Sequence, residues 1–168
     1  MNTDDLTLLA IGGNLAGSFG SVREALETAV ARLDAIGLPV LARSRWWRSA
    51  AWPDPAEPAF LNGVVLTRCD LPAIEILRAL RGLEAQFGPR EGPRNSPRVL
   101  DLDLIAHGRT VLDTPELTVP HPRAAERLFV MGPLAEIAPE WRHPVLGRTA
   151  ADLAGEAETG ADARPIDQ

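Results

Sequence analysis

The stretch Arg98-Val99-Leu100-Asp101-Leu102-Asp103-Leu104 is the clearest structural signal in the sequence. It alternates leucine with aspartate, which is typical of a β-strand with one buried face. Side chains of a strand point to opposite faces in turn, so the leucines predict a core face and the two aspartates lie together on the other. We therefore predict a strand over residues 99–105, within a sheet built by the residues that precede it.

Two amphipathic helices are predicted upstream of this strand. Ser21 is followed three residues later by Glu24, which is a capping-box pattern, and the helix that begins there ends before Gly37. A second helix is expected to be capped by Asp70, with a proline in its first turn, and to end near Gly88. Both helices carry an apolar stripe, so each is expected to pack against the sheet.

Apolar runs complete the order strand, helix, strand, strand, helix, strand. The earlier strands are predicted over residues 6–12, 39–48 and 60–66. This order is typical of an α+β fold with a ferredoxin-like βαββαβ core, in which helices pack on a mostly antiparallel sheet. An added C-terminal helical segment is expected over residues 123–137.

Length and composition predict the domain organisation. A chain of 168 residues with 45% apolar residues is long enough for one good core and too short for two ordinary domains. We expect a single domain over residues 1–153. Residues 154–168 are small, acidic and poor in large apolar side chains, so this tail is expected to be disordered.

The charged residues narrow the classes of function. The formal net charge of -6 argues against a nucleic-acid partner, because binding along phosphates needs an excess of cations. All 17 basic residues are arginine, which excludes a Walker A loop and Schiff-base chemistry, since both need lysine. No apolar run approaches the roughly 18 residues of a membrane span and no signal peptide is apparent, so a cytoplasmic protein without membrane contact is expected.

Asp101 and Asp103 are the first candidate functional residues. Their Cα atoms should lie about 7 Å apart on one face of the strand, where the carboxylates repel each other and oxygen ligands suit a hard cation such as Mg²⁺. Arg90, Arg94 and Arg98 precede the strand at four-residue spacing and would hold phosphate oxygens beside the cation. Together they predict a nucleoside triphosphate site. The alternative is a solvated strand face beside a solubilising loop.

Two further groups are candidates for ligand contacts. His121 lies between two prolines, which restrict its backbone, so it can offer a fixed donor to an anion. Arg123 and Arg127 follow it at a spacing of four, which predicts that they share a helix face. Phe60 and Asn62 share one face of a predicted strand, and an aromatic ring beside an amide suits a flat polar heterocycle. An edge aromatic beside a solvated asparagine is the alternative for that pair.

In their order and spacing these motifs resemble one family, the 6-hydroxymethyl-7,8-dihydropterin pyrophosphokinases. The resemblance covers residues 8–153 and is carried by Ala10-Ile11-Gly12-Gly13-Asn14-Leu15, Phe60-Leu61-Asn62, Arg98 with Leu100-Asp101-Leu102-Asp103, Leu117-Thr118-Val119-Pro120-His121, and Phe129 ahead of Pro133-Leu134-Ala135-Glu136-Ile137-Ala138-Pro139. It implies transfer of diphosphate from ATP to the hydroxymethyl group of the pterin, with release of AMP, in folate biosynthesis.

The resemblance also implies roles for individual residues. Two Mg²⁺ ions would be held by Asp101 and Asp103, and those two residues with Arg90 and Arg98 would be catalytic. The residues that would contact ATP are Glu84, Arg94, Arg98, Leu104, Thr118, His121 and Arg127. The residues that would contact the pterin are Ser49, Ala50, Ala51, Trp52, Phe60, Asn62 and Phe129. The implied partners are these two substrates, and a monomer is expected.

The sequence departs from the family pattern in the arginine loop. Members commonly show Gly-Arg-x-Arg after the second helix and often a tryptophan before the last strand, where this chain has Gly88-Pro89-Arg90-Glu91 and Asn95. The departure puts the turnover rate in question more than the family to which the chain is assigned. Two alternative functions remain open. The first is a non-catalytic nucleotide- or pterin-binding module, or a paralogue with reduced activity. The second is a different magnesium-dependent phosphotransferase or nucleotidyltransferase with the same carboxylate pair.

Overall fold

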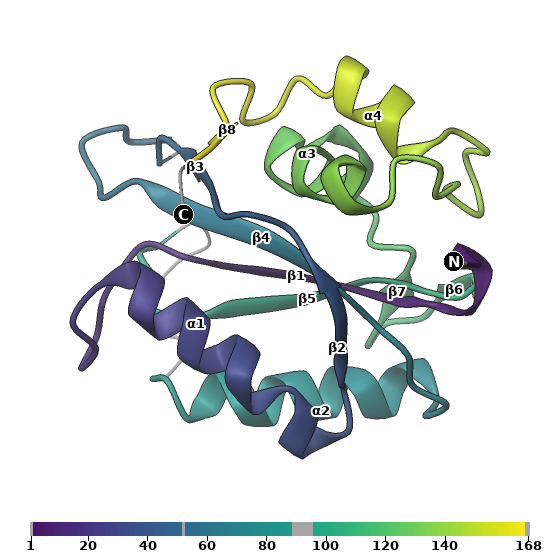
Figure 1. The fold of residues 1–168 in the computed structure, drawn as a ribbon, viewed down its shortest axis with the longest axis horizontal. Coiled ribbons are helices and arrows are strands. Elements are labelled where there is room, and N and C mark those ends of the chain that lie inside the picture. The colour runs from purple at the N-terminus through teal and green to yellow at the C-terminus, as the bar shows by residue number, and fades with distance from the viewer. Residues whose placement is uncertain (1, 52, 89–95, 167–168) are drawn as a thin grey trace.

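The computed structural model describes residues 2–51, 53–88 and 96–166 (Figure 1). The elements of the core are β1 (Thr7–Gly13), α1 (Val22–Arg32), β2 (Val40–Arg43), β3 (Trp47–Ser49), β4 (Phe60–Thr67), α2 (Ala73–Ala85) and β5 (Asp101–His107). The C-terminal part adds β6 (Leu112–Asp113), β7 (Thr118–Val119), α3 (Leu128–Ile137), α4 (Ala150–Glu156) and β8 (Arg164–Pro165). Short 3-10 turns are η1 (Thr3–Asp5), η2 (Asp34–Ile36) and η3 (Ala124–Glu126).

The main sheet confirms the predicted ferredoxin-like topology. Its strands run in the order β5-β1-β4-β3-β8, with β2 also paired to β4, and the pairs between them are antiparallel. The single strand expected over residues 39–48 is divided into β2 and β3, so the prediction was right in place and wrong in continuity. The fold is α+β, with β1 in the middle of the core.

The sheet has helices on both faces (Figure 1). One face packs against α1 and α2, in a core that includes Leu102 and Leu104 of β5. The other face packs against α3 and α4 through a second core that includes Leu66 and Leu134. The odd-numbered residues at the start of β5, including Asp103, lie on this second face and are partly exposed. The alternation in β5 therefore separates a core face from a polar one, as predicted.

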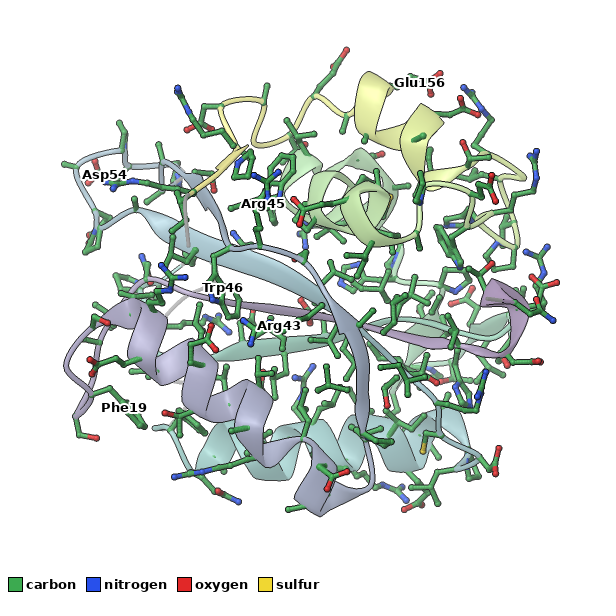
Figure 2. All side chains as sticks on the ribbon, in the orientation of Figure 1. Phe19, Arg43, Arg45, Trp46, Asp54 and Glu156 are labelled. Atoms are coloured by element: carbon green, nitrogen blue, oxygen red, sulfur yellow. The ribbon has the colours of Figure 1, made fainter. Side chains whose placement is uncertain are left out.

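The end of β2 and the residues that link it to β3 are tied to helices on both faces. Glu27 of α1 accepts hydrogen bonds from Trp46 Nε1 (2.8 Å) and Arg43 Nη2 (2.7 Å). Glu136 of α3 accepts from the backbone N–H (2.7 Å) and the Nε (3.0 Å) of Arg45. In Figure 2, Arg43 and Trp46 lie toward α1, whereas Arg45 lies on the side of α3. These bonds fix the segment that leads into Ser49.

Of the two helix caps predicted from the sequence, the one at the start of α1 is confirmed and the one at the start of α2 is wrong. Ser21 Oγ accepts from Glu24 N–H (3.0 Å), and the Glu24 carboxylate accepts from Gly20 N–H (2.8 Å), so the first capping pair is confirmed. Asp70 does not cap α2, because that helix begins at Ala73 with Pro72 at the cap position and without a side-chain cap. The fixed backbone angle of proline suits a helix start without such a cap.

The C-terminal residues correct two further expectations. The helix expected over residues 123–137 is interrupted at Arg127, which has extended backbone angles, so η3 and α3 are separate. The tail expected to be disordered is ordered through residue 166: α4 continues to Glu156, and β8 pairs with β3. Backbone hydrogen bonding to the open edge of β3, burial of Ala163 and packing of Ile166 against the first core hold it in place, although it has few large apolar side chains.

None of the helices in the described ranges is long and apolar enough to cross a membrane.

Candidate active site

Asp101 and Asp103 lie on an edge strand, with β1 as its partner. Burial raises the pKa of Asp103 to about 6, with the charge of Asp101 as the second cause, while Arg81 and Arg127 oppose the rise. Two close carboxylates of this kind favour a bound cation, because the cation relieves their repulsion. The donor set of oxygens alone fits Mg²⁺.

The protein contributes few ligands to such a cation. Within residues 2–51, 53–88 and 96–166, no group of three or more His, Cys, Asp or Glu side chains could hold a metal ion. Two carboxylates are nevertheless the usual protein share of a magnesium site that completes its shell with water and substrate phosphate oxygens. The arrangement therefore fits a metal that arrives with an anionic substrate better than it fits a closed structural cage.

Arg98 is held beside this pair by Asn14. Its backbone N–H donates to Asn14 Oδ1 (2.8 Å), and its carbonyl accepts from the N–H groups of Asn14 (2.8 Å) and Leu15 (3.0 Å). Its Nη1 lies 3.9 Å from Asp101 Oδ1. Gly13 permits the close approach, because a Cβ there would lie 2.2 Å from the Val99 carbonyl oxygen. Sequence reasoning identified Arg98 and missed the positioning role of the buried Asn14.

His121 is prepared to donate a hydrogen bond. Its backbone N–H donates to the Ile105 carbonyl (2.8 Å), and its Nδ1 accepts from the Arg123 N–H (3.2 Å). Burial lowers its pKa to about 4, with the charge of Arg127 as the next cause. The imidazole is therefore neutral near pH 7, and with Nδ1 used as an acceptor its hydrogen is on Nε2.

A cavity of about 310 Å³ adjoins this polar cluster. It brings together three residues that the sequence predicted for ATP, Leu104, Thr118 and His121, and the predicted metal ligand Asp103. The other lining residues are Leu77, Arg81, Thr114, Pro115, Glu116, Leu117 and Pro122. The volume is at the lower end of the range for small-molecule sites.

Glu84 of α2 is almost fully buried against the outer edge of β5. Its Oε2 accepts from the Leu102 N–H (2.6 Å), and Arg81 Nη1 donates both to its Oε1 (2.8 Å) and to the Leu102 carbonyl (2.8 Å). The two side chains thus satisfy the free backbone groups of an edge strand. Arg81 itself lines the cavity and was not predicted, although its spacing of three from Glu84 on α2 was a signal that could have found it.

Asn62 and Asp101 lie on the same face of the sheet, on either side of β1. Gly12 is the register partner of both, so the three residues form one row across β4, β1 and β5. A Cβ on Gly12 would lie 2.2 Å from Asn62 Oδ1, which shows that the Asn62 side chain extends over the glycine. Adjacent strands are about 5 Å apart, so the Cα atoms of Asn62 and Asp101 are separated by about 10 Å.

Two aromatic residues were predicted to contact the pterin together with Asn62. Phe60 is partly exposed and pairs with Ser49 of β3. Phe129 of α3 is also partly exposed, and the guanidinium of Arg127 lies 5.7 Å from the centre of its ring. Farther along β4, α3 packs on the sheet in the second core, through residues such as Val64.

Of the remaining predicted site residues, some lie within the residues that the structure describes and some lie outside them. Ser49 and Ala51 are buried, and the Ala50 N–H donates to Asp162 Oδ2 (2.8 Å). Trp52, Arg90 and Arg94 were also predicted as site residues and lie outside the described residues, together with the unusual loop positions Pro89, Glu91 and Asn95.

The fold and this polar face define a ferredoxin-like α+β domain in which a pair of carboxylates suited to a bound cation lies beside a small-molecule cavity. The family model for 7,8-dihydro-6-hydroxymethylpterin-pyrophosphokinase (HPPK) matches residues 8–139. The chain belongs to this family, and it is therefore an enzyme of the pyrophosphokinase class.

Named relatives agree with this assignment. A 2-amino-4-hydroxy-6-hydroxymethyldihydropteridine pyrophosphokinase of Synechocystis sp. is 40% identical over 148 residues, which cover 88% of this chain and 75% of that protein. The protein of the same name from Pseudomonas aeruginosa is 37% identical over 136 residues, which cover 81% and 82%. The alternative of a non-catalytic binding module is not favoured, because the relatives are named as enzymes.

Solved structures support the fold. A crystal structure of a triple-mutant Plasmodium falciparum HPPK-DHPS with SDX-DHP has a TM-score of 0.69 at 13% identity, and the wild type with pteroate has 0.69 at 11%. The match covers 89% of this chain and 44% of each of those chains, so this chain spans less than half of their length. At such low identity the likeness concerns the fold alone.

Proposed function

We propose that this chain transfers the diphosphate of ATP to the hydroxymethyl group of 6-hydroxymethyl-7,8-dihydropterin and releases AMP, a step of folate biosynthesis. The observation that carries the proposal is the shared row of Asn62, Gly12 and Asp101. It supports a heterocycle contact and a magnesium contact about 10 Å apart on one open face, across a residue without a side chain. Such a spacing suits a pterin at Asn62 and a magnesium-bound ATP at Asp101, with their reacting groups between the two residues.

Asp101 and Asp103 would bind two Mg²⁺ ions, which offset charge on the triphosphate when bound. Arg98 would hold phosphate oxygens with a planar guanidinium, and His121 would donate from Nε2. Arg127 would complete the anion contacts. Support comes from its positive charge, which opposes the rise in the pKa of Asp103 and lowers the pKa of His121.

The nucleoside of ATP would occupy the cavity beside Asp103. Leu77 and Leu104 supply apolar walls there, and Thr118 supplies a hydroxyl. Glu84 would act indirectly, by holding Leu102 and orienting Arg81 at the cavity wall. This role differs from the direct contact expected from the sequence.

The pterin would lie between the rings of Phe60 and Phe129. Asn62 would bond the polar edge of the heterocycle, since its amide both donates and accepts, and backbone groups of residues 49–51 would complete that edge. The pterin hydroxyl oxygen would then attack the β-phosphorus of ATP, the bond from that phosphorus to the α-phosphate oxygen would break, and the hydroxyl proton would be released. The chain contributes chiefly position and charge.

A product assay tests the proposal. The protein is incubated with ATP, Mg²⁺ and the pterin alcohol, and AMP and the pterin diphosphate are expected in equal amounts. ADP would indicate an ordinary kinase, pyrophosphate a nucleotidyltransferase, and no product a binding protein. The proposed site is formed by one chain, so we also propose that a monomer is active, which sedimentation under assay conditions would check.

A further inference from the structure

The C-terminal segment of residues 159–166 lies against both walls proposed for the pterin. Its strand β8 pairs with β3, in register Trp47 to Pro165 and Arg48 to Arg164. In Figure 1 this segment runs from α4 past α3 to the edge of β3. It thus joins two elements that are far apart in sequence and that supply the opposite walls.

Asp162 makes the contact with the first wall. If the pairing of β8 with β3 is continued by two residues, Asp162 falls opposite Ala50. There the carboxylate Oδ2 accepts the Ala50 N–H at 2.8 Å. Ala50 follows Ser49, which pairs with Phe60, so the bond fixes the backbone that borders the ring. It joins residues 112 positions apart in the chain.

Thr159 and Gly160 make the contact with the second wall. The Thr159 carbonyl accepts the Leu128 N–H (2.9 Å), and its N–H donates to the Glu126 carbonyl (3.1 Å), so the segment is bonded to the start of α3. A Cβ on Gly160 would lie 2.5 Å from Phe129 Cδ1, which shows that the ring packs directly on the glycine. Gly160 also has a φ of +69°, which favours glycine.

We propose that Asp162 is a positioning residue for the pterin, because the four residues from Thr159 to Asp162 hold the Ala50 backbone and the Phe129 ring at a fixed separation. The inference rests on the proposed function and names a residue of that site outside the stretch matched by the family model, which ends at residue 139. The carboxylate acts through the Ala50 backbone rather than on the reacting atoms.

Steady-state kinetics of Asp162→Ala test the role. Loss of one hydrogen bond at an exposed site should raise the KM for the pterin by about three- to tenfold, while kcat and the KM for MgATP stay near the wild-type values. Asp162→Asn should recover much of the pterin KM, because an amide oxygen also accepts from the Ala50 N–H. Glu158→Ala, an exposed acidic residue of the same tail, is the matched control and should leave all constants unchanged.

The outcomes separate the possible failures. An unchanged pterin KM in Asp162→Ala overturns the inference, as does an equal change in both KM values with a lowered melting temperature, which indicates a general structural role. A lowered pterin KM would mean that the carboxylate competes with the pterin for the Ala50 N–H, and it would also overturn the inference. Absence of AMP formation by the wild-type protein would instead refute the proposed function.

Gly160→Ala tests the second wall independently. Its methyl group must displace the Phe129 ring, so the pterin KM should rise while the KM for MgATP does not. A thermal melt of the same sample shows whether the variant is folded. A folded variant with the wild-type pterin KM would contradict the claim that this segment sets the position of Phe129.

Discussion

The two faces of β5 differ in what they tolerate. Leu102 and Leu104 are 0% and 3% exposed within the core formed with α1 and α2, whereas Asp101 and Asp103 lie partly exposed on the other face. One strand therefore carries two sets of residues with nearly independent tasks. With the proposed role of the carboxylates, the comparison predicts that stability and turnover respond separately to substitutions one residue apart.

The largest effect is expected on the carboxylate face. Asp101→Asn and Asp103→Asn each remove a proposed magnesium ligand and keep the shape of the side chain, so diphosphate transfer should fall by at least about 10⁴-fold, or roughly 5.5 kcal/mol. Calorimetric titration should show weakened MgATP binding, with pterin binding better preserved. Wild-type turnover in either variant would show that the carboxylates form only a solvated face.

The second-largest effect is expected on the core face of β5, where a substitution should lower stability. Leu102→Ala removes a fully buried side chain and should lower the free energy of unfolding by about 3 to 5 kcal/mol, because the lost contacts leave a cavity. Urea denaturation measures the loss, and folded protein at low temperature should still turn over. Leu41→Ala, at a strand position that is 46% exposed, is the control and should change stability by less than about 1 kcal/mol.

Arg98→Lys sharpens the comparison at the polar face. The change keeps the charge and removes the guanidinium fork, so turnover should fall by about 10²- to 10³-fold, or roughly 2 to 4 kcal/mol. Stability should hardly change, because Asn14 contacts the backbone of this residue rather than its side chain. Arg48→Lys, at the exposed position of β3, is a matched control. Unaltered kinetics in Arg98→Lys would remove its side chain from the site.

The smallest expected effect is a pH-dependent stability difference without metal. The pKa of Asp103, raised to about 6 from 3.8, means that the folded state holds this proton more tightly than the unfolded state. Its stabilising contribution is present below pH 3.8 and is lost as the pH rises through 6. Asp103→Asn should therefore be more stable than wild type at pH 8, by on the order of 1 kcal/mol, with the difference shrinking toward pH 4.

Denaturation in EDTA at several pH values measures this difference. Glu140→Gln, which changes an exposed carboxylate in a turn, is the control for the general effect of charge. A difference between Asp103→Asn and wild type that is the same at pH 8 and pH 5 would contradict the raised pKa. Added Mg²⁺ should stabilise the wild type more than the variant, because a bound ion favours the ionised carboxylate.

The order of strands and helices was predictable because it depends on local patterns. The alternation in β5 and the capping pair at Ser21 act over a few residues, and periodicity records them directly. The same local view failed at Asp70, where a proline at the cap position determined the helix start, and in the tail, where the composition suggested disorder but the open edge of β3 provided hydrogen-bond partners.

By itself the sequence determined which face of β5 is polar and which residues are the candidates for binding magnesium and phosphate. Only the tertiary structure decided how they are held. Asn14 reaches Arg98 over 84 positions, Glu84 bonds the backbone of Leu102, and Asp162 reaches Ala50 over 112 positions. Such contacts have no period along the chain, since they arise where the sheet places edge strands and chain ends side by side, so they become visible only when the strands are paired.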